Sequence, residues 1–364
     1  TSAGITGEGY VAESLIGNLT AAEEILHGFI ETIEYRYAAV FGRLGAEWNE
    51  KYYINFTGRR DGSSRFGPGK RLAQFWAVGG AWIFSEENLF DPGGFLSFGK
   101  LRASYGTSGS DQIGDYGYLD AYEATPGPGG LYPTQLFNPN YSWEVNKKLE
   151  AALDLGFFKD RIRLDISWFQ NRSSNQLVGY NLPAITGFRS VQANLPATVE
   201  NTGVEVELST RNLDTENFTW ETFFNITLPS NELVHYPGIE QSSYANTYKV
   251  GEPLNISLLY QYEGLDPETG FYRVTDVNED GRYDYNDRVV VQDYGRDFFG
   301  GISNNLTYKN FSLQFLLEFV KQEGRLSLFN AGNLSNQRAM VLEALEEGSQ
   351  FQKVSASSQA NTAY

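Results

Sequence analysis

The chain has 364 residues, of which 41% are hydrophobic and 15% aromatic, with no Cys, two His and a formal net charge of −17. The lack of Cys excludes a disulfide framework and a thiolate metal site, and the distant His27 and His235 argue against a histidine-based zinc site. The acidic balance argues against nucleic acid as a partner, because binding to phosphate needs a basic face.

The distribution of apolar residues indicates a β protein. No stretch approaches the ~20 apolar residues that a membrane helix needs, whereas abundant Tyr, Phe and Trp favour strands and membrane interfaces. A soluble β protein and a β-barrel both fit, because a barrel wall is apolar outside and polar inside. The N-terminus lacks the basic and apolar segments of a signal peptide, so we expect either a processed chain or a fragment whose start is missing.

Alternation of apolar and polar residues predicts strands along most of the chain. The clearest case is 161–170, in which Ile162, Leu164 and Ile166 alternate with polar residues, the period of two that a strand with one polar face requires. The same reasoning predicts about eleven strands, at 34–48, 52–57, 73–84, 101–106, 150–158, 161–170, 204–209, 217–228, 256–263, 300–308 and 311–319.

The predicted connections are of two kinds. Tight turns are expected at 49–50, 159–160 and 309–310, and long loops at 61–72, 108–147, 172–197, 229–255 and 264–299. Short turns at one end of the strands and long loops at the other are typical of outer-membrane barrels, and such long loops argue against a soluble sandwich or jelly roll. Beyond the strands, 336–347 predicts a short helix and 355–364 an unfinished loop.

One loop has the residue spacing of a calcium site. It follows the pattern D-x-[DN]-x-[DN]-G, with Gly281 at the sharp turn and an acid at the twelfth position. We expect Ca²⁺ rather than Mg²⁺, which keeps its waters; the alternative is a solvated acidic turn held by Asx hydrogen bonds. The expected ligands are Asp276, Asn278, Asp280, the Arg282 carbonyl, Asp284 and Asp287.

Other polar and aromatic residues suggest binding sites, but none suggests catalysis. The cluster of Arg59, Arg60, Asp61 and Arg65 is interpreted as a rim turn held by local Arg–Asp pairs rather than as a binding site. Aromatic rings on loops could stack on sugar faces, with girdle or loop packing as the alternative; the substrate candidates are Tyr116, Tyr118 and Trp143, followed by Tyr122, Tyr132, Tyr141 and Tyr180. The adjacent acids Glu86-Glu87 and Glu346-Glu347 do not suggest the two facing carboxylates that a glycosidase needs, so no catalytic residue and no enzyme is predicted.

Several motifs resemble, in the same order, those of the SusC/RagA family of TonB-linked outer-membrane proteins. They run from about residue 35 to 320, and their order carries more weight than any one of them. The motifs are RRDGSSRFG (Arg59–Gly67), Phe75–Glu87, Leu101–Gly109, Gln112–Tyr116, Asn201–Leu208, Gly264–Gly270, Asp276–Val291 and Gly300–Leu313.

The resemblance implies an all-β fold, part of a large antiparallel transmembrane β-barrel of about 22 strands closed by an N-terminal plug. Residues 1–364 are then a partial barrel without the plug, with strands about 34–320 and a helical or loop extracellular segment about 330–364. Because such a part has open edges and could not sit in a bilayer alone, we expect it to belong to a longer protein.

The resemblance also implies a function in the outer membrane of a Gram-negative cell. This is energy-driven import of oligosaccharides or peptides, with a SusD-like surface lipoprotein above the barrel, TonB–ExbB–ExbD acting through the plug, and lipid around the wall. The alternatives are a soluble or surface-attached glycan-binding β protein with a calcium-stabilised loop, and a surface adhesin.

Overall fold

The computed structural model describes residues 2–3, 6–15, 18–26, 30–88, 90, 94–124, 130–182, 184–188, 190–265 and 272–324. The predicted helix at 336–347 and the predicted loop at 355–364 lie outside the described residues. Among the described residues, no helix is both long enough and apolar enough to span a membrane.

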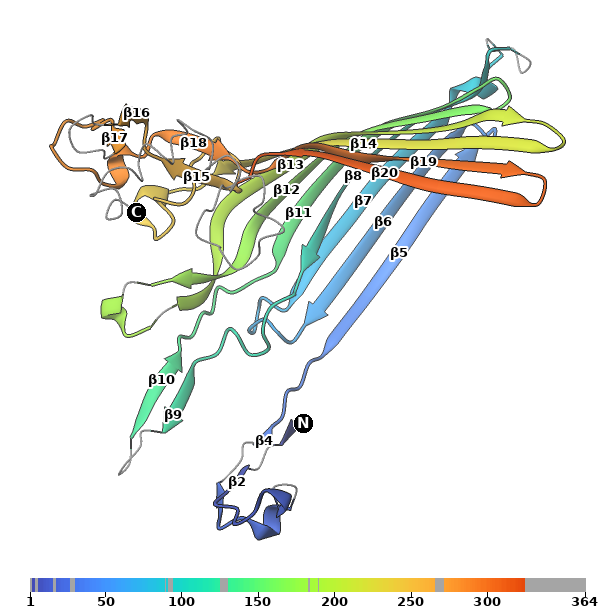
Figure 1. The fold of residues 1–364 in the computed structure, drawn as a ribbon. Coiled ribbons are helices and arrows are strands. Elements are labelled where there is room, and N and C mark those ends of the chain that lie inside the picture. Colours follow the sequence, from blue (N-terminus) through green and yellow to red (C-terminus); the bar gives the residue numbers. More distant parts are fainter. Residues whose placement is uncertain are drawn as a thin grey trace.

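Ten strands form one antiparallel sheet (Figure 1), in which each strand pairs only with the sheet strands that come before and after it along the chain. Sheet order therefore follows chain order, as in an up-and-down barrel wall. The strands are β5 (Tyr37–Trp48), β6 (Tyr52–Ser63), β7 (Leu72–Ile83), β8 (Leu96–Ser110), β11 (Glu144–Phe157), β12 (Ile162–Asn181), β13 (Ser190–Asp214), β14 (Phe218–His235), β19 (Arg296–Tyr308) and β20 (Phe311–Gln322).

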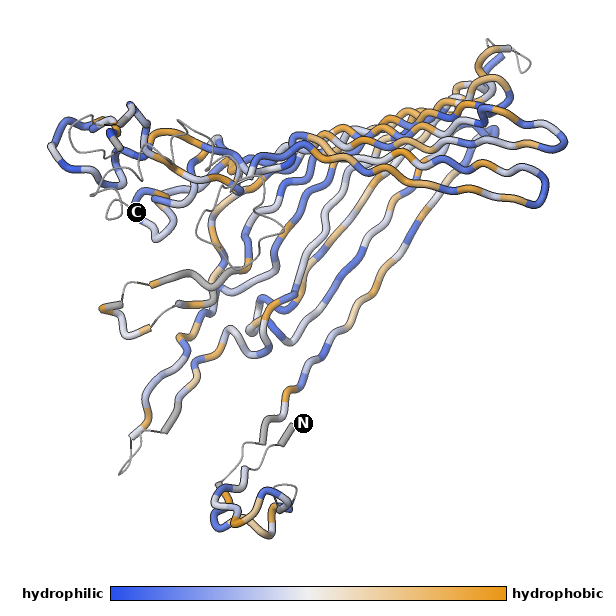
Figure 2. Tube along the Cα trace, in the orientation of Figure 1, coloured by the Kyte–Doolittle hydropathy of each residue, from blue (hydrophilic) through white to orange (hydrophobic). Residues whose placement is uncertain are grey.

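The register gives the sheet one apolar and one polar face. Leu153 lies opposite Ile166, which lies opposite Val206. One residue further along, Asp154 lies opposite Asp165 on the other face, because successive side chains of a strand point to opposite sides. The alternation is visible along the strands in Figure 2. A slip of one residue would exchange the two faces, so the pattern fixes the register.

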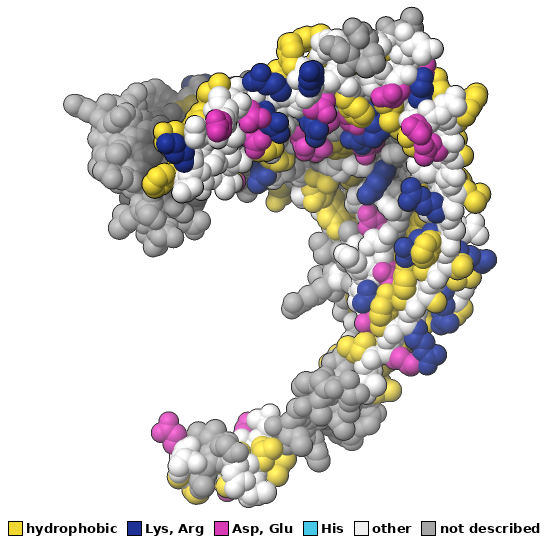
Figure 3. Space-filling view, turned by 90° about the vertical axis from the view of Figure 1, so that its right-hand side faces the viewer, with side chains coloured by type: hydrophobic (Ala, Val, Ile, Leu, Met, Phe, Trp, Pro, Cys, Tyr) yellow, Lys and Arg dark blue, Asp and Glu magenta, His cyan; other side chains and the backbone are white. Residues whose placement is uncertain are grey.

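The apolar face lies open to the surroundings. Val40 is 69% exposed, Leu44 75%, Leu313 59% and Leu317 60%. Within the described residues no second sheet covers this face, and the ten-stranded sheet is curved and open on one side (Figure 3). A soluble sandwich buries its apolar faces against each other, so this sheet has the construction of a wall that faces lipid.

An aromatic row marks the short-turn end of the sheet. The Tyr52 ring lies between Trp48 and Trp82, with centroid distances of 6.0 and 6.4 Å. The Tyr52 hydroxyl and the Trp82 indole both donate to Glu87, at 2.5 and 3.1 Å. These hydrogen bonds, that of Tyr52 first, lower the pKa of the Glu87 carboxyl. Rings with an apolar body and a bonded polar end are typical of the membrane interface.

Smaller elements lie outside the ten-stranded sheet. Five two-stranded sheets pair β1 with β4, β2 with β3, β9 with β10, β15 with β18 and β16 with β17. Their strands are β1 (Ser2–Ala3), β2 (Thr6–Glu8), β3 (Glu24–Leu26), β4 (Ile30–Glu31), β9 (Ala121–Ala124), β10 (Leu131–Gln135), β15 (Ile256–Leu259), β16 (Tyr262–Leu265), β17 (Tyr272–Val274) and β18 (Val290–Asp293). The 3₁₀ helices are η1 (Glu13–Leu15), η2 (Leu19–Ala21), η3 (Phe84–Glu86), η4 (Ala184–Thr186), η5 (Ile239–Gln241) and η6 (Tyr285–Asp287).

Ten of the predicted strands are present in the large sheet, and the eleventh is confirmed as strand only in part and lies outside that sheet. Residues 256–263 do alternate, but Ile256–Leu259 pairs with β18 within a loop and does not reach the wall. Two predicted loops, 172–197 and 229–255, are also wrong in part, because β12, β13 and β14 continue through much of them. There the apolar alternation stops while the backbone ladder continues through polar pairs such as Asn201 and Asn231.

The ends of the strands differ as predicted. Turns at 49–51, 158–161, 215–217 and 309–310 close one end, whereas 111–143 and 236–295 extend from the other (Figure 1). This asymmetry is that of outer-membrane barrels, whose long loops are extracellular.

Candidate functional site

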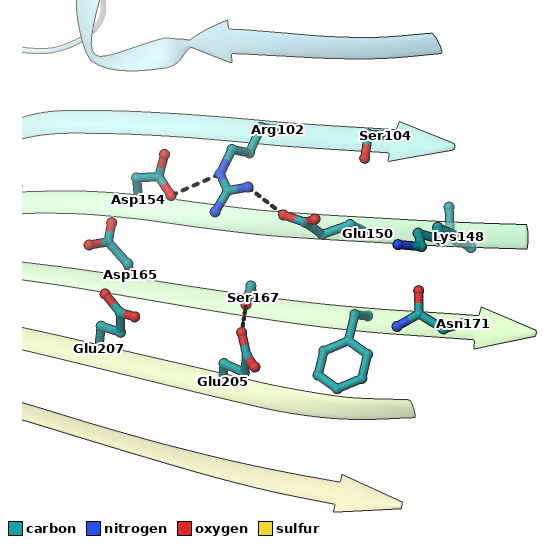
Figure 4. Close-up of a pocket in the computed structure, with 12 residues that line it drawn as sticks. Arg102, Ser104, Lys148, Glu150, Asp154, Asp165, Ser167, Asn171, Glu205 and Glu207 are labelled. Carbon is teal, nitrogen blue, oxygen red and sulfur yellow. Dashed lines mark hydrogen bonds and ion pairs between the residues drawn. The ribbon is translucent and has the colours of Figure 1, made fainter. Parts of the chain in front are cut away.

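The polar face of the sheet contains a hollow of about 640 Å³ formed by β8, β11, β12 and β13. Arg102 of β8 lines one side of the hollow and bridges two carboxylates of β11, donating to Glu150 and, from Nε at 3.4 Å, to Asp154 (Figure 4). Lys100 approaches the second oxygen of Asp154 at 3.6 Å. Arg102 and Lys100 of β8 therefore both pair with carboxylates of β11.

Acidic side chains exceed basic ones in this hollow. Asp165 lies opposite both Asp154 and Glu207, and like charges directly opposite each other repel. Within the described residues, neither Asp165, Glu205 nor Glu207 has a basic partner within ion-pair distance; Glu205 accepts only a long bond of 3.5 Å from Ser167. The hollow therefore has a hydrophilic, negatively charged lining.

At the loop end, the polar face gives way to a buried aromatic cluster, here called the rim cluster. Phe66 is 0% exposed and lies 5.0 Å from Trp143 and 6.1 Å from Tyr141, ring centroid to centroid. Phe75 of β7 and Tyr118 complete the rim cluster. Because Phe75 shares its face of the sheet with Arg59 of β6, the loops fold inward over the hollow rather than outward.

The RRDGSSRFG segment holds this rim together. Arg59 donates to Asp61 at 2.5 Å, and Arg65 donates to Asp115 at 3.0 Å and to the Asp111 carbonyl at 2.9 Å. The prediction of a rim turn held by local Arg–Asp pairs is confirmed only in part: Arg59 and Asp61 pair within strand β6, Arg60 lies on the opposite face, and Arg65 pairs with Asp115 of a different loop. Asp61 is only 5% exposed, so its charge needs these donors.

A second buried cluster lies at the same end of β13 and β14. It joins Val199 and Leu233, which face each other across the two strands, to Tyr236 and Ile239 of the following segment. The backbone of Leu233 also bonds to Glu252 and Gly251, at 2.9 Å each. The long connection after β14 is therefore anchored on the polar face of the wall.

The aromatic substrate candidates fall into two groups. Tyr118 and Trp143 are 9% and 6% exposed and belong to the rim cluster, which leaves little ring face for a ligand, as it does for Tyr141. Tyr116 is 41% exposed at a positive φ of 60°, and its hydroxyl accepts from the Glu34 amide at 2.9 Å. Tyr122 and Tyr132 are 55% and 44% exposed, and the side chain of Tyr180 lies outside the described residues.

Burial of Tyr141 predicts an alkaline weakening of the rim cluster. Burial raises the pKa of its hydroxyl to about 12, while an unfolded tyrosine titrates near about 10. The stabilisation is therefore complete below pH about 10 and is lost as the pH rises towards about 12, in total roughly 2–3 kcal/mol. Stability measured across this window should fall more steeply for the wild type than for Tyr141→Phe, which has no titrating hydroxyl; equal slopes would contradict the assignment.

The predicted calcium loop is ordered by its own backbone. Gly281, at a φ of +76°, makes the sharp turn, and its amide donates to Asp276 at 2.8 Å. Asn278 and Asp280 accept from the Asp280 and Arg282 amides at 3.2 and 2.8 Å. These carboxylate and amide oxygens lie along one turn, and each retains a lone pair beyond the bond it accepts.

The acid at the twelfth position of this loop is bound to the backbone. Asp287 is 0% exposed, and its two oxygens accept from the amides of Val277 and Asp284, at 2.8 and 2.9 Å. These backbone hydrogen bonds lower the pKa of Asp287, the Asp284 amide contributing most. In the described part of the chain no three acidic or histidine side chains converge as a metal-binding group. Asp287 thus closes the loop through the backbone.

Several residues of the site were not predicted from the sequence. Arg102, Asp154 and Asp165 were each within predicted strands, and the polar positions of the alternation were the available signal. What the pattern could not show was register, which places these residues on neighbouring strands of one hollow.

A curved antiparallel sheet with an open apolar face, a polar hollow and long loops at one end is the wall of an outer-membrane β-barrel. The chain belongs to the TonB-dependent receptor β-barrel family, since residues 11–334 match the family model "TonB dependent receptor-like, beta-barrel". Members lie in the outer membrane of Gram-negative bacteria and are transporters rather than enzymes. The family therefore confirms the predicted location and the prediction that no enzyme is present, and it sets aside the soluble alternative.

Individual relatives support the same assignment. The chain is 30% identical over 305 residues to the TonB-dependent receptor SusC of Bacteroides thetaiotaomicron, covering 76% of this chain and 30% of SusC. It is 29% identical over 317 residues to the TonB-dependent receptor P3 of Formosa agariphila, covering 78% and 32%. The structure of the RagAB peptide transporter shares the fold, with a TM-score of 0.75 and 24% identity over 86% of this chain and 36% of that one. The predicted SusC/RagA resemblance is confirmed, and the chain spans about a third of the length of its curated relatives.

Proposed function

We propose that this chain forms part of the barrel of an importer that carries oligosaccharides or peptides across the outer membrane together with a SusD-like surface lipoprotein. The observation that carries the proposal is the combination of a lipid-facing apolar face with a charged hollow on the opposite face. A passage for polar solutes needs such an inner lining, because unpaired polar groups of a solute cannot cross hydrocarbon.

One of the similar structures bears on the substrate class. SusC is a TonB-dependent receptor, and the RagAB structures are described as a peptide transporter. Energy would come from TonB–ExbB–ExbD acting through a plug that fills the lumen. The loops that fold inward over the hollow lie where a lipoprotein cap would meet the barrel, since long loops of such barrels are extracellular.

The test is purification of the tagged full-length protein from outer membranes, followed by identification of co-purifying lipoproteins and bound ligands. We expect a lipoprotein in near-equal amount, and uptake of the identified ligand that stops when the proton-motive force is collapsed. Isolation of the barrel without a lipoprotein, together with uptake that is insensitive to the uncoupler, would contradict the proposal.

A second proposal is that the loop from Asp276 to Asp287 binds Ca²⁺ and is rigidified by it. The spacing of Asp276, Asn278 and Asp280 around Gly281 supports it, with the Arg282 carbonyl and Asp284 as further donors and Asp287 bound to the backbone. Calorimetric titration with Ca²⁺ should give one binding event that Asp280→Ala removes, with Glu279→Ala as the matched control. No heat of binding in the wild type would establish the backbone-held acidic turn instead.

A further inference from the structure

We propose that the apolar face of the wall binds a phosphorylated glycolipid of the outer leaflet, in a groove across β5, β6 and β7. The groove measures about 480 Å³. It faces away from the acidic hollow of Figure 4, and it faces the membrane, so the site does not depend on what the barrel imports. The residues that line it on this face are Val40, Gly42, Gly58, Arg60, Gln74 and Trp76.

Two basic residues at the loop end of the wall lie on its apolar face. Arg60 of β6 lies directly opposite Val40 of β5, and residues directly opposite each other share a face of the sheet. Lys147 of β11 lies six residues before Leu153, an even spacing that puts both on the same face. Both basic side chains therefore face the membrane rather than the hollow.

The position of Arg60 along β6 places it at the level of lipid headgroups. It lies eight residues beyond Tyr52 of the aromatic row, which is about 26 Å of strand. The tilt of barrel strands reduces this to about 20 Å of depth, close to the ~25 Å height of an apolar band. Next to Arg60, the rings of Trp76 and Tyr105 meet edge to face at 5.5 Å, as in a second aromatic girdle. Because the loop end is extracellular, these headgroups belong to the outer leaflet.

This part of the apolar face carries only positive charge, although the whole chain has a net charge of −17. On β5, β6, β7, β8 and β11, the only charged residues that face outward are Arg60 and Lys147. Neither has an acidic partner within ion-pair distance in the described part of the chain, whereas Arg172, the next basic residue along this face, pairs with Glu200. A phosphate supplies the missing counter-charge, because it forms strong charge-assisted hydrogen bonds with arginine and lysine.

Two glycines open a depression in the wall beside Arg60. Gly42 and Gly58 lie directly opposite each other on β5 and β6. A Cβ added at Gly42 would meet nothing within 4 Å, and one at Gly58 would meet only the Phe56 ring, at 3.7 Å. The Trp76 ring, 41% exposed, borders the depression on β7. The methylene groups of an acyl chain fill such an apolar depression while the phosphate above them meets Arg60.

The spacing of the two basic residues favours a wide headgroup. Their strands, β6 and β11, are three strand spacings apart in the sheet, or about 14 Å. A disaccharide that carries a phosphate at each end and several acyl chains can engage both residues, whereas the smaller headgroup of a glycerophospholipid engages one. Gln74 and Thr107, on the strands between, add polar groups for the sugar hydroxyls.

A second copy of the chain fits this face less well than an anionic lipid. A two-fold contact would place the same patch on both sides of the interface. Arg60 and Lys147 would then meet a surface that has the same two basic residues and, on these five strands, no acidic one. Like charges in such a desolvated contact repel.

The test is native mass spectrometry of the full-length protein in detergent, titrated with diphosphoryl lipid A. Dephosphorylated lipid A, which keeps the same acyl chains, is the paired probe. We expect the wild type to prefer the phosphorylated lipid, with an apparent affinity roughly tenfold weaker in Arg60→Gln and in Lys147→Gln. The matched control is Lys148→Gln, which removes the same charge from the opposite face of β11 and should bind as the wild type.

Gly42→Leu tests the depression without changing any charge. The leucine side chain has room there and takes the place of the acyl chain, so it should also weaken binding. Equal binding of the two lipids by the wild type, or unchanged affinity in both Arg60→Gln and Lys147→Gln, would overturn the inference. An equal loss in Lys148→Gln would overturn it too, since the attraction would then be unspecific. A dimer that Gly42→Leu dissociates would assign the face to a second copy instead.

Discussion

Phe66→Ala should open the rim of the barrel wall, lowering the local free energy of unfolding by about 3–5 kcal/mol. Phe66 is fully buried, and its ring contacts Tyr141 and Trp143, which come from the far end of a long connection. Truncation leaves a cavity that the surrounding backbone cannot fill, because β7 and β11 are fixed by their ladders. Hydrogen exchange of the amides in 111–143 would report the loss directly.

The matched control for this variant is Phe137→Ala. Phe137 lies in the same connection but is 56% exposed, so its truncation should change exchange by less than about 1 kcal/mol. Equal effects of the two substitutions would show that the rim cluster does not hold the loops.

Ile166→Arg should prevent stable insertion of the sheet into a bilayer, whereas Ser167→Arg should be tolerated. The two positions are adjacent on β12 and point to opposite faces. An arginine on the lipid face of a barrel costs about 2–4 kcal/mol near the bilayer centre. On the other face, an arginine at 167 would lie beside Glu205 and near Glu207, which have no basic partner within the described residues.

Urea unfolding of the full-length protein in lipid vesicles measures this difference. The expected order of stability is Ser167→Arg close to the wild type and Ile166→Arg well below it. The reverse order would mean that the charged face meets lipid, which would contradict the assignment of the two faces.

The fold was predictable where one face is apolar and the other polar. Ile162, Leu164 and Ile166 mark a strand unmistakably, because lipid contact demands an apolar side chain at every second position. At the loop end of β12 and β13, lipid contact no longer requires an apolar side chain at every second position, and both faces become polar. These parts of the two strands were therefore interpreted as loops. The strand predicted at 256–263 failed as a wall strand for the opposite reason, since a short loop sheet also alternates.

The site was predictable only in part. The Arg–Asp pairs of the RRDGSSRFG segment are local enough to infer from sequence, but the contact from Arg65 to Asp115 depends on how two loops pack. Tyr118 and Trp143 were proposed as ligand contacts because they are loop aromatics; tertiary packing buried them instead. The role of Asp287 as a backbone clasp was hidden by a spacing that fits a metal ligand equally well.

The neighbour-to-neighbour order of the ten strands has a consequence for how the wall assembles. Nearly every strand pairs with the one made just before it, so contact order is low for a β protein and hairpins can form one after another. One exception is the step from β8 to β11, across residues 111–143. The larger exception is the step from β14 to β19, across residues 236–295. Closing that connection costs about 2–3 kcal/mol more entropy than closing the turn at 215–217. We therefore expect the β19–β20 hairpin to form first and to dock as one unit, with docking as the slow step for this part of the wall.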